Sequence, residues 1–544
     1  MKKFAVGLVL VALLGAACGG GGDGGDAEEA GPSTTAEEAG TPQPGGKIVY
    51  GLEADTSSPW TPQAAVCAIS CHMVMRSVFD TMTLPNEEGE PEGYLLESFE
   101  SNDDFTEWTL QVRAGITFHD GSPLDGAVIA DNLNRHLTSF LTAKALGDVA
   151  SVEATGPMTV LVKTKRSWSH FPLFLSGQVG YVASSQWLAA VDADPAKAAE
   201  PVGTGPFVFK SYQPGRSFVA TKNADYWREG LPYLDEVEYR FIPEVEARES
   251  ALKAGDLDIM HTSNGEVISE MRDNDDLAMI ESTKYGETSY TLLRVDEEGG
   301  PLNDVRVRRA MAMAIPQEDY VEARTRGVMK PANGPFPPGT VGYLEDTGYP
   351  TYDAEGAKAL VEEYEAENGP IKFAMTTTND PFNLVSYQLL QAYWKAVGID
   401  CEIAQVEQGQ FIVKALTGDI EAFGWRNHGG FDVDTQNYWW DSDAAAPTGT
   451  LALNFGRMRD EVIDKNLDIV RTSNDPDERK EAAEAINRRF GEQVYNIWEW
   501  WTVWGLVFQK DVHAVGDFEL PSGSNGIFGA GIGGTHQISQ IWKG

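Results

Sequence analysis

The chain has few of the residues that catalytic and metal sites most often use. Only four cysteines and eight histidines occur in 544 residues, and the histidines are scattered. The sequence contains no HExxH, GxSxG or P-loop motif, the signatures of zinc proteases, serine hydrolases and nucleotide-binding proteins. Acidic residues are numerous, but no pair stands out as the acid and base of a glycosidase. We therefore predict no catalytic residue, no metal site and no cofactor.

Basic residues are also scarce. The 42 lysines and arginines are outnumbered by 82 aspartates and glutamates, which gives a formal net charge of −40. Such an acidic chain is repelled by phosphate backbones and anionic lipids, so we predict no nucleic-acid partner. Apart from the N-terminus, no apolar run approaches the length of a transmembrane helix. A hydrophobic content of 42%, with 14 tryptophans, nevertheless predicts a globular body with more than one core.

The N-terminus, MKKFAVGLVLVALLGAAC, has the features of a secretion signal. Lys2 and Lys3 precede an apolar run over residues 4–14, which is too short to span a membrane. Residues 1–18 resemble a bacterial lipoprotein signal in which Cys18 is lipidated, although Gly15 stands where leucine is usual. A secretory signal without lipidation and an ordinary buried helix are the alternatives.

Residues 19–46 contain mainly glycine, proline, serine, threonine and acidic residues. Such a segment has too little apolar surface to offset the entropy of ordering, so we predict a flexible tether. Signal, cysteine and tether together predict an extracytoplasmic domain. We expect a lipid anchor to hold it to the cell membrane, in the periplasm or at the outer face of the cytoplasmic membrane.

Two of the remaining cysteines, Cys67 and Cys71, are four residues apart in the sequence CAISC. In an oxidising compartment this spacing favours a local disulfide or a pair of buried thiols. A zinc pair is the other interpretation, but no second CxxC or nearby pair of histidines completes it.

From residue 47 onward, strand and helix patterns alternate, which predicts α/β lobes with covered sheets. Apolar spacing predicts a helix over residues 71–84, and alternation over residues 105–118 predicts a hairpin. Asp125, Asp304 and Asp353 precede helical patterns and are expected to be N-caps.

Four long segments carry a family resemblance. They are residues 108–135 (WTLQVRAGITFHDGSPLDGAVIADNLNR), residues 201–259 (beginning PVGTGPFVF), residues 302–315 (LNDVRVRRAMAMAI) and residues 352–369 (YDAEGAKALVEEYEAENG). The chain after residue 46 resembles the peptide/nickel class of extracytoplasmic solute-binding proteins of ABC importers.

The resemblance implies a type II periplasmic-binding-protein-like fold, with two hinge-linked lobes, a ligand cleft between them and an extra subdomain. Lobe closure around the ligand would produce the form that the transporter recognises. The ranges that it implies are 47–78, 205–285 and 506–544 for lobe one, 79–204 for the inserted subdomain and 286–505 for lobe two.

Residues 425–440, WRNHGGFDVDTQNYWW, are the strongest candidate for a wall of the pocket, with core packing as the alternative. The segment resembles one in which relatives place an aspartate that binds the ligand's ammonium group. His428 stands at that position, so Asp432 or Asp434 takes the role, or the ligand has no amine there. Arg426 could instead meet a carboxylate or phosphate. The candidate ligand residues of this segment are Trp425, Arg426, Asn427, His428, Asp432, Asp434, Tyr438 and Trp439.

Three further candidates lie elsewhere. Trp60 and Cys67 precede the first predicted helix, where the resemblance implies pocket-lining residues, and Glu53 lies nearby. Trp501 belongs to a second aromatic cluster, residues 495–508. In that cluster Trp498, Trp501 and Trp504 have helical spacing, whereas a strand would place Trp501 opposite Trp498.

We therefore predict a monomeric protein that captures a peptide or peptide-sized solute and delivers it to the permease subunits of an ABC transporter. A non-peptide solute in the same fold, such as an oligosaccharide or a metal chelate, is the main alternative. A secreted hydrolase and a sensory subunit that presents its ligand to a receptor are the others.

Overall fold

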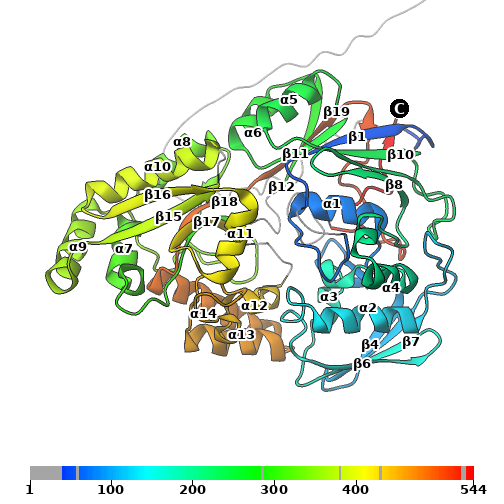
Figure 1. The fold of residues 1–544 in the computed structure, drawn as a ribbon, viewed down its shortest axis with the longest axis horizontal. Helices are drawn as coiled ribbons and strands as arrows, with labels where there is room; N and C mark the ends of the chain where they lie inside the picture. Colours follow the sequence, from blue (N-terminus) through cyan, green and yellow to red (C-terminus); the bar gives the residue numbers. More distant parts are fainter. Residues whose placement is uncertain (1–39, 57–59, 283–286, 379–380, 428–431, 528–534) are drawn as a thin grey trace, which may run out of the picture.

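The computed structural model describes residues 40–56, 60–282, 287–378, 381–427, 432–527 and 535–544 (Figure 1). The predicted signal over residues 1–18, the lipidation site Cys18, most of the tether and His428 lie outside these residues. Within the described ranges, no helix is both long enough and apolar enough to cross a membrane.

Lobe one is built on a seven-stranded mixed sheet. Its central strand β1 (Lys47–Leu52) pairs in parallel with β10 (Glu236–Phe241) on one side and β11 (Ile259–Thr262) on the other. The outer strands are β9 (Ser217–Lys222) and β8 (Phe207–Gln213) beyond β10, and β19 (Trp504–Gln509) and β12 (Leu277–Ser282) beyond β11. The helices are α1 (Ile69–Val78), α5 (Val245–Lys253) and α6 (Gly265–Arg272). A short pair, β20 (Val512–His513) and β21 (Trp542–Lys543), lies near the C-terminus.

Helix α1 is buried along its whole length in the lobe-one core. It ends at Val78, so the predicted helix over residues 71–84 is too long, because the chain turns extended at Phe79 and enters a strand at Thr83. Gly205 donates its backbone N–H to the Val78 carbonyl at 2.8 Å. A Cβ atom on Gly203 would lie 2.1 Å from that same oxygen. The two glycines of GTGPF therefore allow the chain to return from the insertion close against α1.

The inserted subdomain has its own four-stranded antiparallel sheet, in the order β4 (Leu96–Ser101), β5 (Glu107–Val112), β7 (Thr159–Thr164), β6 (Val149–Gly156). Its other elements are the pair β2 (Thr83–Pro85) and β3 (Pro91–Gly93) and the helices α2 (Gly126–Thr138), α3 (Phe171–Phe174) and α4 (Ser185–Ala193). Asp125 caps α2 as predicted, accepting from the Val128 N–H.

The hairpin predicted over residues 105–118 is wrong. That segment supplies only β5, whose neighbours are β4 and β7. The second half turns away at Gly115, whose φ is +82°, and makes a single bridge from Thr117 to Pro123.

Lobe two contains a six-stranded sheet in the order β14 (Lys330–Pro331), β18 (Asn496–Trp501), β13 (Thr288–Leu293), β17 (Ala422–Asn427), β15 (Lys372–Thr378), β16 (Asp400–Val406). Its helices are α7 (Val305–Met313), α8 (Gln317–Thr325), α9 (Ala354–Asn368), α10 (Pro381–Ala396), α11 (Gln408–Thr417), α12 (Asn437–Trp440), α13 (Glu461–Thr472) and α14 (Pro476–Gln493). Asp304 and Asp353 cap α7 and α9, as predicted.

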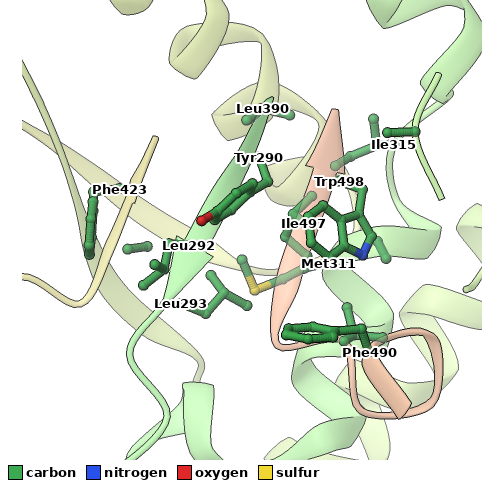
Figure 2. Close-up of a cluster of buried hydrophobic side chains, with 14 of the residues drawn as sticks. Tyr290, Leu292, Leu293, Met311, Ile315, Leu390, Phe423, Phe490, Ile497 and Trp498 are labelled. Carbon is green, nitrogen blue, oxygen red and sulfur yellow. The ribbon is translucent and has the colours of Figure 1, made fainter. Parts of the chain in front are cut away.

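The lobe-two core lies between this sheet and its helices (Figure 2). The Trp498 ring packs against Tyr290 of β13 at 5.1 Å and against Phe490 of α14 at 5.7 Å between ring centroids. Tyr290 and Trp498 lie far apart in the sequence, so their contact forms only when β13 and β18 have paired.

The chain crosses between the lobes twice, because β12 and β19 belong to the lobe-one sheet whereas β13 and β18 belong to the lobe-two sheet. The aromatic cluster of residues 495–508 is therefore two strands, and the helical interpretation of its tryptophan spacing is wrong. Trp504 pairs with Ser282 in the lobe-one sheet, so lobe one resumes two residues earlier than the expected residue 506. The Thr502 N–H donates to the Glu287 carbonyl at 2.8 Å and ties the two crossings together.

Candidate functional site

A cavity of about 260 Å³ lies between the two lobes. Lobe one contributes Glu53, just after β1, and Ala68 and Ile69 at the start of α1. Lobe two contributes the ends of β15 and β17, the start of β13 and part of α10. The cavity therefore lies outside the carboxyl ends of parallel strands, where open α/β sheets bind their ligands.

Among the described residues, three carboxylates and one guanidinium line this cavity. The carboxylates belong to Glu53, Glu287 and Glu499, and the guanidinium belongs to Arg426. Glu287 and Glu499 are only 2% and 4% exposed. A buried charge is costly unless it is paired or hydrogen-bonded, so the partners of each determine what the cavity can bind.

Glu499 is held by two hydroxyl groups of β13. Ser289 Oγ donates to it at 3.1 Å and Thr291 Oγ1 donates at 3.0 Å. Burial raises the pKa of the Glu499 carboxyl to about 7, although these hydroxyls and the more distant Arg324 lower it. Within the described residues, no lysine, arginine or histidine forms an ion pair with Glu499.

Arg426, by contrast, is already engaged at the hinge. Its Nη1 atom lies 3.3 Å from Glu287 Oε2 and donates to Ser263 Oγ of lobe one at 3.0 Å. Its guanidinium lies 5.4 Å from the centre of the Trp504 ring, and Trp504 Nε1 donates to Glu287 at 3.2 Å. The side chain thus links lobe two to lobe one and balances the charge of Glu287.

The remaining wall is aromatic and hydroxylic. Trp425 stacks on Phe411 of α11, with ring centroids 6.1 Å apart and planes within 18°. Trp500 and Tyr387 also line the cavity. Thr377, at the end of β15, is 1% exposed, and its hydroxyl has no hydrogen-bond partner in the described part of the chain.

Asp432 and Asp434 do not face this cavity. Arg471 Nε donates to Asp434 at 2.6 Å, and Trp168 Nε1 of the inserted subdomain donates to the other oxygen at 2.8 Å. Asp432 forms an ion pair with Arg479. Burial raises the pKa of the Asp434 carboxyl. Burial also opposes ionisation of Asp432, but the nearby Arg479 guanidinium lowers the pKa of Asp432 below its ordinary value. Both aspartates form ion pairs with arginines of α13 and α14. Neither therefore takes the role of the aspartate that relatives have at the position of residue 428.

These residues instead form a second contact between the lobes, which we call the rim latch: Asp148, Arg166, Trp168 and His170 of the inserted subdomain with Asp432, Asp434, Asp468, Arg471 and Arg479 of lobe two. In Figure 1 the inserted subdomain and the α12–α14 region lie side by side where the latch forms. The lobes therefore contact each other at two places, the hinge and the rim latch.

The other predicted residues are divided between the cavity and the cores. Asn427 is buried and bonds Thr288 and Pro335, and it lines a smaller cavity of about 30 Å³ inside lobe two together with Trp439. Trp439 and its neighbours form a helical turn rather than a strand. Tyr438 packs against the hydrophobic core of the inserted subdomain.

Trp60 and Trp501 lie away from the cavity. Trp60 is 1% exposed and packs in the lobe-one core against Tyr212 and Phe218. Trp501 packs edge-on against Tyr343, and its neighbour Trp500 lines the cavity instead. Cys67 and Cys71 form a disulfide immediately before and within α1. Among the described residues, no cluster of histidine, cysteine, aspartate or glutamate is suited to a metal ion.

Sequence reasoning missed Glu287, Glu499 and Thr377. Glu499 carried a signal, because it is a single charge in the otherwise apolar strand NIWEWW. A buried charge in a strand is seldom retained without a partner or a function. Glu287 and Thr377 carried no signal in the sequence, because their place at the cavity depends on which strand ends meet at the cleft.

A two-lobed α/β fold with a cavity between the lobes is typical of solute-binding proteins. The model of bacterial extracellular solute-binding proteins, family 5, matches residues 90–448, and the chain belongs to this family. It is 26% identical to di/tripeptide-binding protein 2 of Pseudomonas aeruginosa over 437 residues, covering 74% of this chain and 79% of the relative.

Solved structures share the fold. The periplasmic binding protein DppA of Helicobacter pylori, in complex with the peptide STSA, superposes with a TM-score of 0.82 at 20% identity, covering 92% of this chain and 98% of that one. The binding protein AgaA of A. tumefaciens R10, in complex with agropinic acid, gives a TM-score of 0.79 at 23% identity, covering 92% and 99%. These relatives are solute-binding proteins of an extracytoplasmic family, and they hold ligands of different chemistry.

Proposed function

We propose that this chain captures a solute of dipeptide size in the cleft between its lobes and delivers it to the permease subunits of an ABC importer. The observation that carries the proposal is the cavity of about 260 Å³ lined from both lobes. Drug-sized ligands occupy pockets of about 300–1,000 Å³, so a cavity of this size suits a short peptide or a molecule of similar bulk.

Closure supplies the signal for transport. A ligand held by Glu53 and Ala68 of lobe one and by Trp425 of lobe two stabilises the closed form, because only that form offers both walls at once. The hinge contacts of Arg426 and the rim latch then fix the relative position of the lobes. A permease would recognise the surface that the two lobes form in this arrangement.

The peptide class is supported by the similarity to a di/tripeptide-binding protein over most of both chains. A non-peptide solute is the second candidate, supported by the similar fold of the agropinic acid complex. We further propose that Cys18 is lipidated, that the tether of residues 19–46 links it to lobe one at β1, and that the protein acts as a monomer.

Native mass spectrometry of the protein as purified tests this function. We expect an added mass of a few hundred daltons that is released on denaturation and fragments as short peptides. A single non-peptide mass would favour the second candidate. Absence of any bound mass, together with no change in melting temperature on addition of a dipeptide library, would contradict binding of peptides.

A further inference from the structure

The charges that line the cleft cavity are unbalanced. Of the described residues that line it, three are glutamates and Arg426 is the one cation. Arg426 forms an ion pair with Glu287 at 3.3 Å, and Trp504 Nε1 donates a second hydrogen bond to Glu287. The excess negative charge at the cavity therefore resides on Glu499, from lobe two, and on Glu53, from lobe one, which also interacts electrostatically with Arg248.

Glu499 has the surroundings of a group that awaits a counter-ion. Its two hydrogen bonds come from neutral hydroxyls, and it is 4% exposed. Arg324 of α8 lowers the pKa of Glu499 but forms no ion pair with it within the described residues, and it donates to Ser386 Oγ at 2.9 Å and stacks over Phe382 at 4.1 Å. Removing a carboxylate from water without a cation costs several kcal/mol, and a bound cation would recover part of that cost.

An unpartnered hydroxyl lines the same cavity. Thr377 is 1% exposed and its Oγ1 atom makes no hydrogen bond within the described residues, although buried hydroxyls nearly always have a partner. A ligand that donates hydrogen bonds would satisfy it. An ammonium group has three donors, which matches two carboxylates and one hydroxyl.

We propose that the cavity selects solutes that carry a cationic nitrogen, and that Glu499, Thr377 and Glu53 receive that group. This rests on the proposed function and adds to it the charge of the solute. The aspartate expected at position 428 in peptide-binding relatives is thereby replaced by a carboxylate on the second hinge strand, β18.

The proposal predicts that the affinity for a cationic solute changes with pH. Binding of a cation requires the ionised form of Glu499, whose pKa is raised to about 7, so affinity should rise with pH and level off above neutrality. The charged and titratable groups around it are Arg324 and Tyr320 on α8, Tyr349, Tyr387 and the Glu287–Arg426 pair. Burial raises the pKa of Tyr320 and Tyr349 above their ordinary value, so these two stay neutral throughout the range.

Calorimetric titration of the full chain with matched probes tests the proposal. The probes are Ala-Phe, its C-terminal amide and its N-acetyl form, which carry net charges of 0, +1 and −1, with putrescine and arginine as non-peptide cations. We expect the amide and the free dipeptide to bind, and the acetyl form to bind at least tenfold more weakly. Between pH 5.5 and pH 7, where an α-amine of pKa about 7.7–8.0 stays charged, affinity should rise roughly tenfold.

Two variants identify the residue responsible. Glu499→Gln should abolish the pH dependence and weaken binding of the amide tenfold or more. Thr377→Val should weaken it less and retain the pH dependence. Glu355→Gln, at a side chain 85% exposed on α9, is the matched control and should change neither. Melting curves of each variant verify that it is folded.

The outcomes separate the two proposals. Binding of putrescine or arginine without any dipeptide would retain cation selection and contradict a peptide solute. Equal affinity for the acetyl form and the free dipeptide would retain peptide binding and overturn cation selection. Failure of all the cationic probes to bind, or a Glu499→Gln protein with unchanged affinity and pH dependence, would also overturn cation selection.

Discussion

Arg471 of α13 joins the two lobes through a single guanidinium. Its Nε atom donates to Asp434 of lobe two at 2.6 Å, and its Nη1 atom donates to Asp148 of the inserted subdomain at 2.8 Å. The same guanidinium lies 4.2 Å from the centre of the Trp168 ring. Arg471 is 1% exposed, and its contacts with Asp148 and Trp168 form only when the inserted subdomain meets lobe two, so part of the pairing of this buried charge depends on closure.

Replacing Asp148 should therefore weaken closure, and it also removes the charged partner of Arg166 at 2.9 Å within the rim latch. In Asp148→Asn, Arg471 keeps its bond to Asp434 and loses a charged partner across the rim. Charge-assisted hydrogen bonds contribute about 1.5–3 kcal/mol, so we expect ligand affinity to fall about tenfold. Small-angle scattering should show a larger radius of gyration in the variant without ligand.

Asp103→Asn is the control for that experiment, because Asp103 is exposed in the turn between β4 and β5 of the same subdomain. It should leave affinity and dimensions unchanged. If Asp148→Asn matched this control in both measurements, the rim latch would have no part in closure.

Asp434 should be required for stability and not for ligand recognition. Asparagine at this position leaves Arg471 buried with a weaker partner inside lobe two and breaks the charged bond from Trp168. Loss of one member of a buried ion pair costs about 3–5 kcal/mol, so urea unfolding of Asp434→Asn should shift by that order. A variant that remained as stable as the parent but lost binding of amine ligands would instead identify Asp434 as the ammonium clamp.

The role of Asp434 could not be predicted from the sequence, whereas the helix caps could. Helix caps such as Asp125 and Asp304 were predictable because each bonds a backbone N–H within three residues. The aspartates after residue 431 depend on arginines about 40 residues further along, and no local pattern reveals which of many arginines will arrive. The family resemblance suggested a ligand clamp at one of these aspartates, whereas the structure shows both of them in ion pairs with distant arginines.

The candidate site divides in the same way. The structure places Trp425 and Arg426 at the cavity, where the dense aromatic stretch suggested a wall. Glu499 reaches it only because β18 pairs with β13 at the crossing between the lobes, a non-local register that the sequence does not display. Trp60 shows the converse, since its position near the first helix suggested the cleft and its ring is covered by two strands of lobe one.

The disulfide between Cys67 and Cys71 should fix the segment that precedes α1. Its loop is short, and the chain-entropy treatment gives about 2 kcal/mol for a ring of this length. We expect the double replacement of Cys67 and Cys71 by serine to lower the free energy of unfolding by about that amount. Ligand affinity should also fall, because Ala68 and Ile69 between the two sulfurs line the cavity.

Reducing the native protein provides a check that needs no mutation. A reductant should lower the melting temperature of the parent and leave that of the double variant unchanged. A parent protein that is insensitive to reductant would argue that the bond adds no stability.

Glu499 should make the ligand-free protein less stable as pH rises. Burial raises its pKa from 4.5 to about 7, so between these values the folded state holds more protons than the unfolded state. The contribution of Glu499 to the free energy of unfolding is then fully present below pH 4.5, declines toward pH 7 and stays lower above it, by about 3 kcal/mol from a shift of this size.

Glu499→Gln removes the titration, so without ligand the variant should be as stable as the parent near pH 4.5 and more stable than the parent at pH 8. Urea unfolding at the two pH values measures the difference. A variant less stable than the parent at both would mean that the carboxylate serves the fold, whereas a gain confined to high pH would mean that the chain sacrifices stability for a negative charge in its cleft.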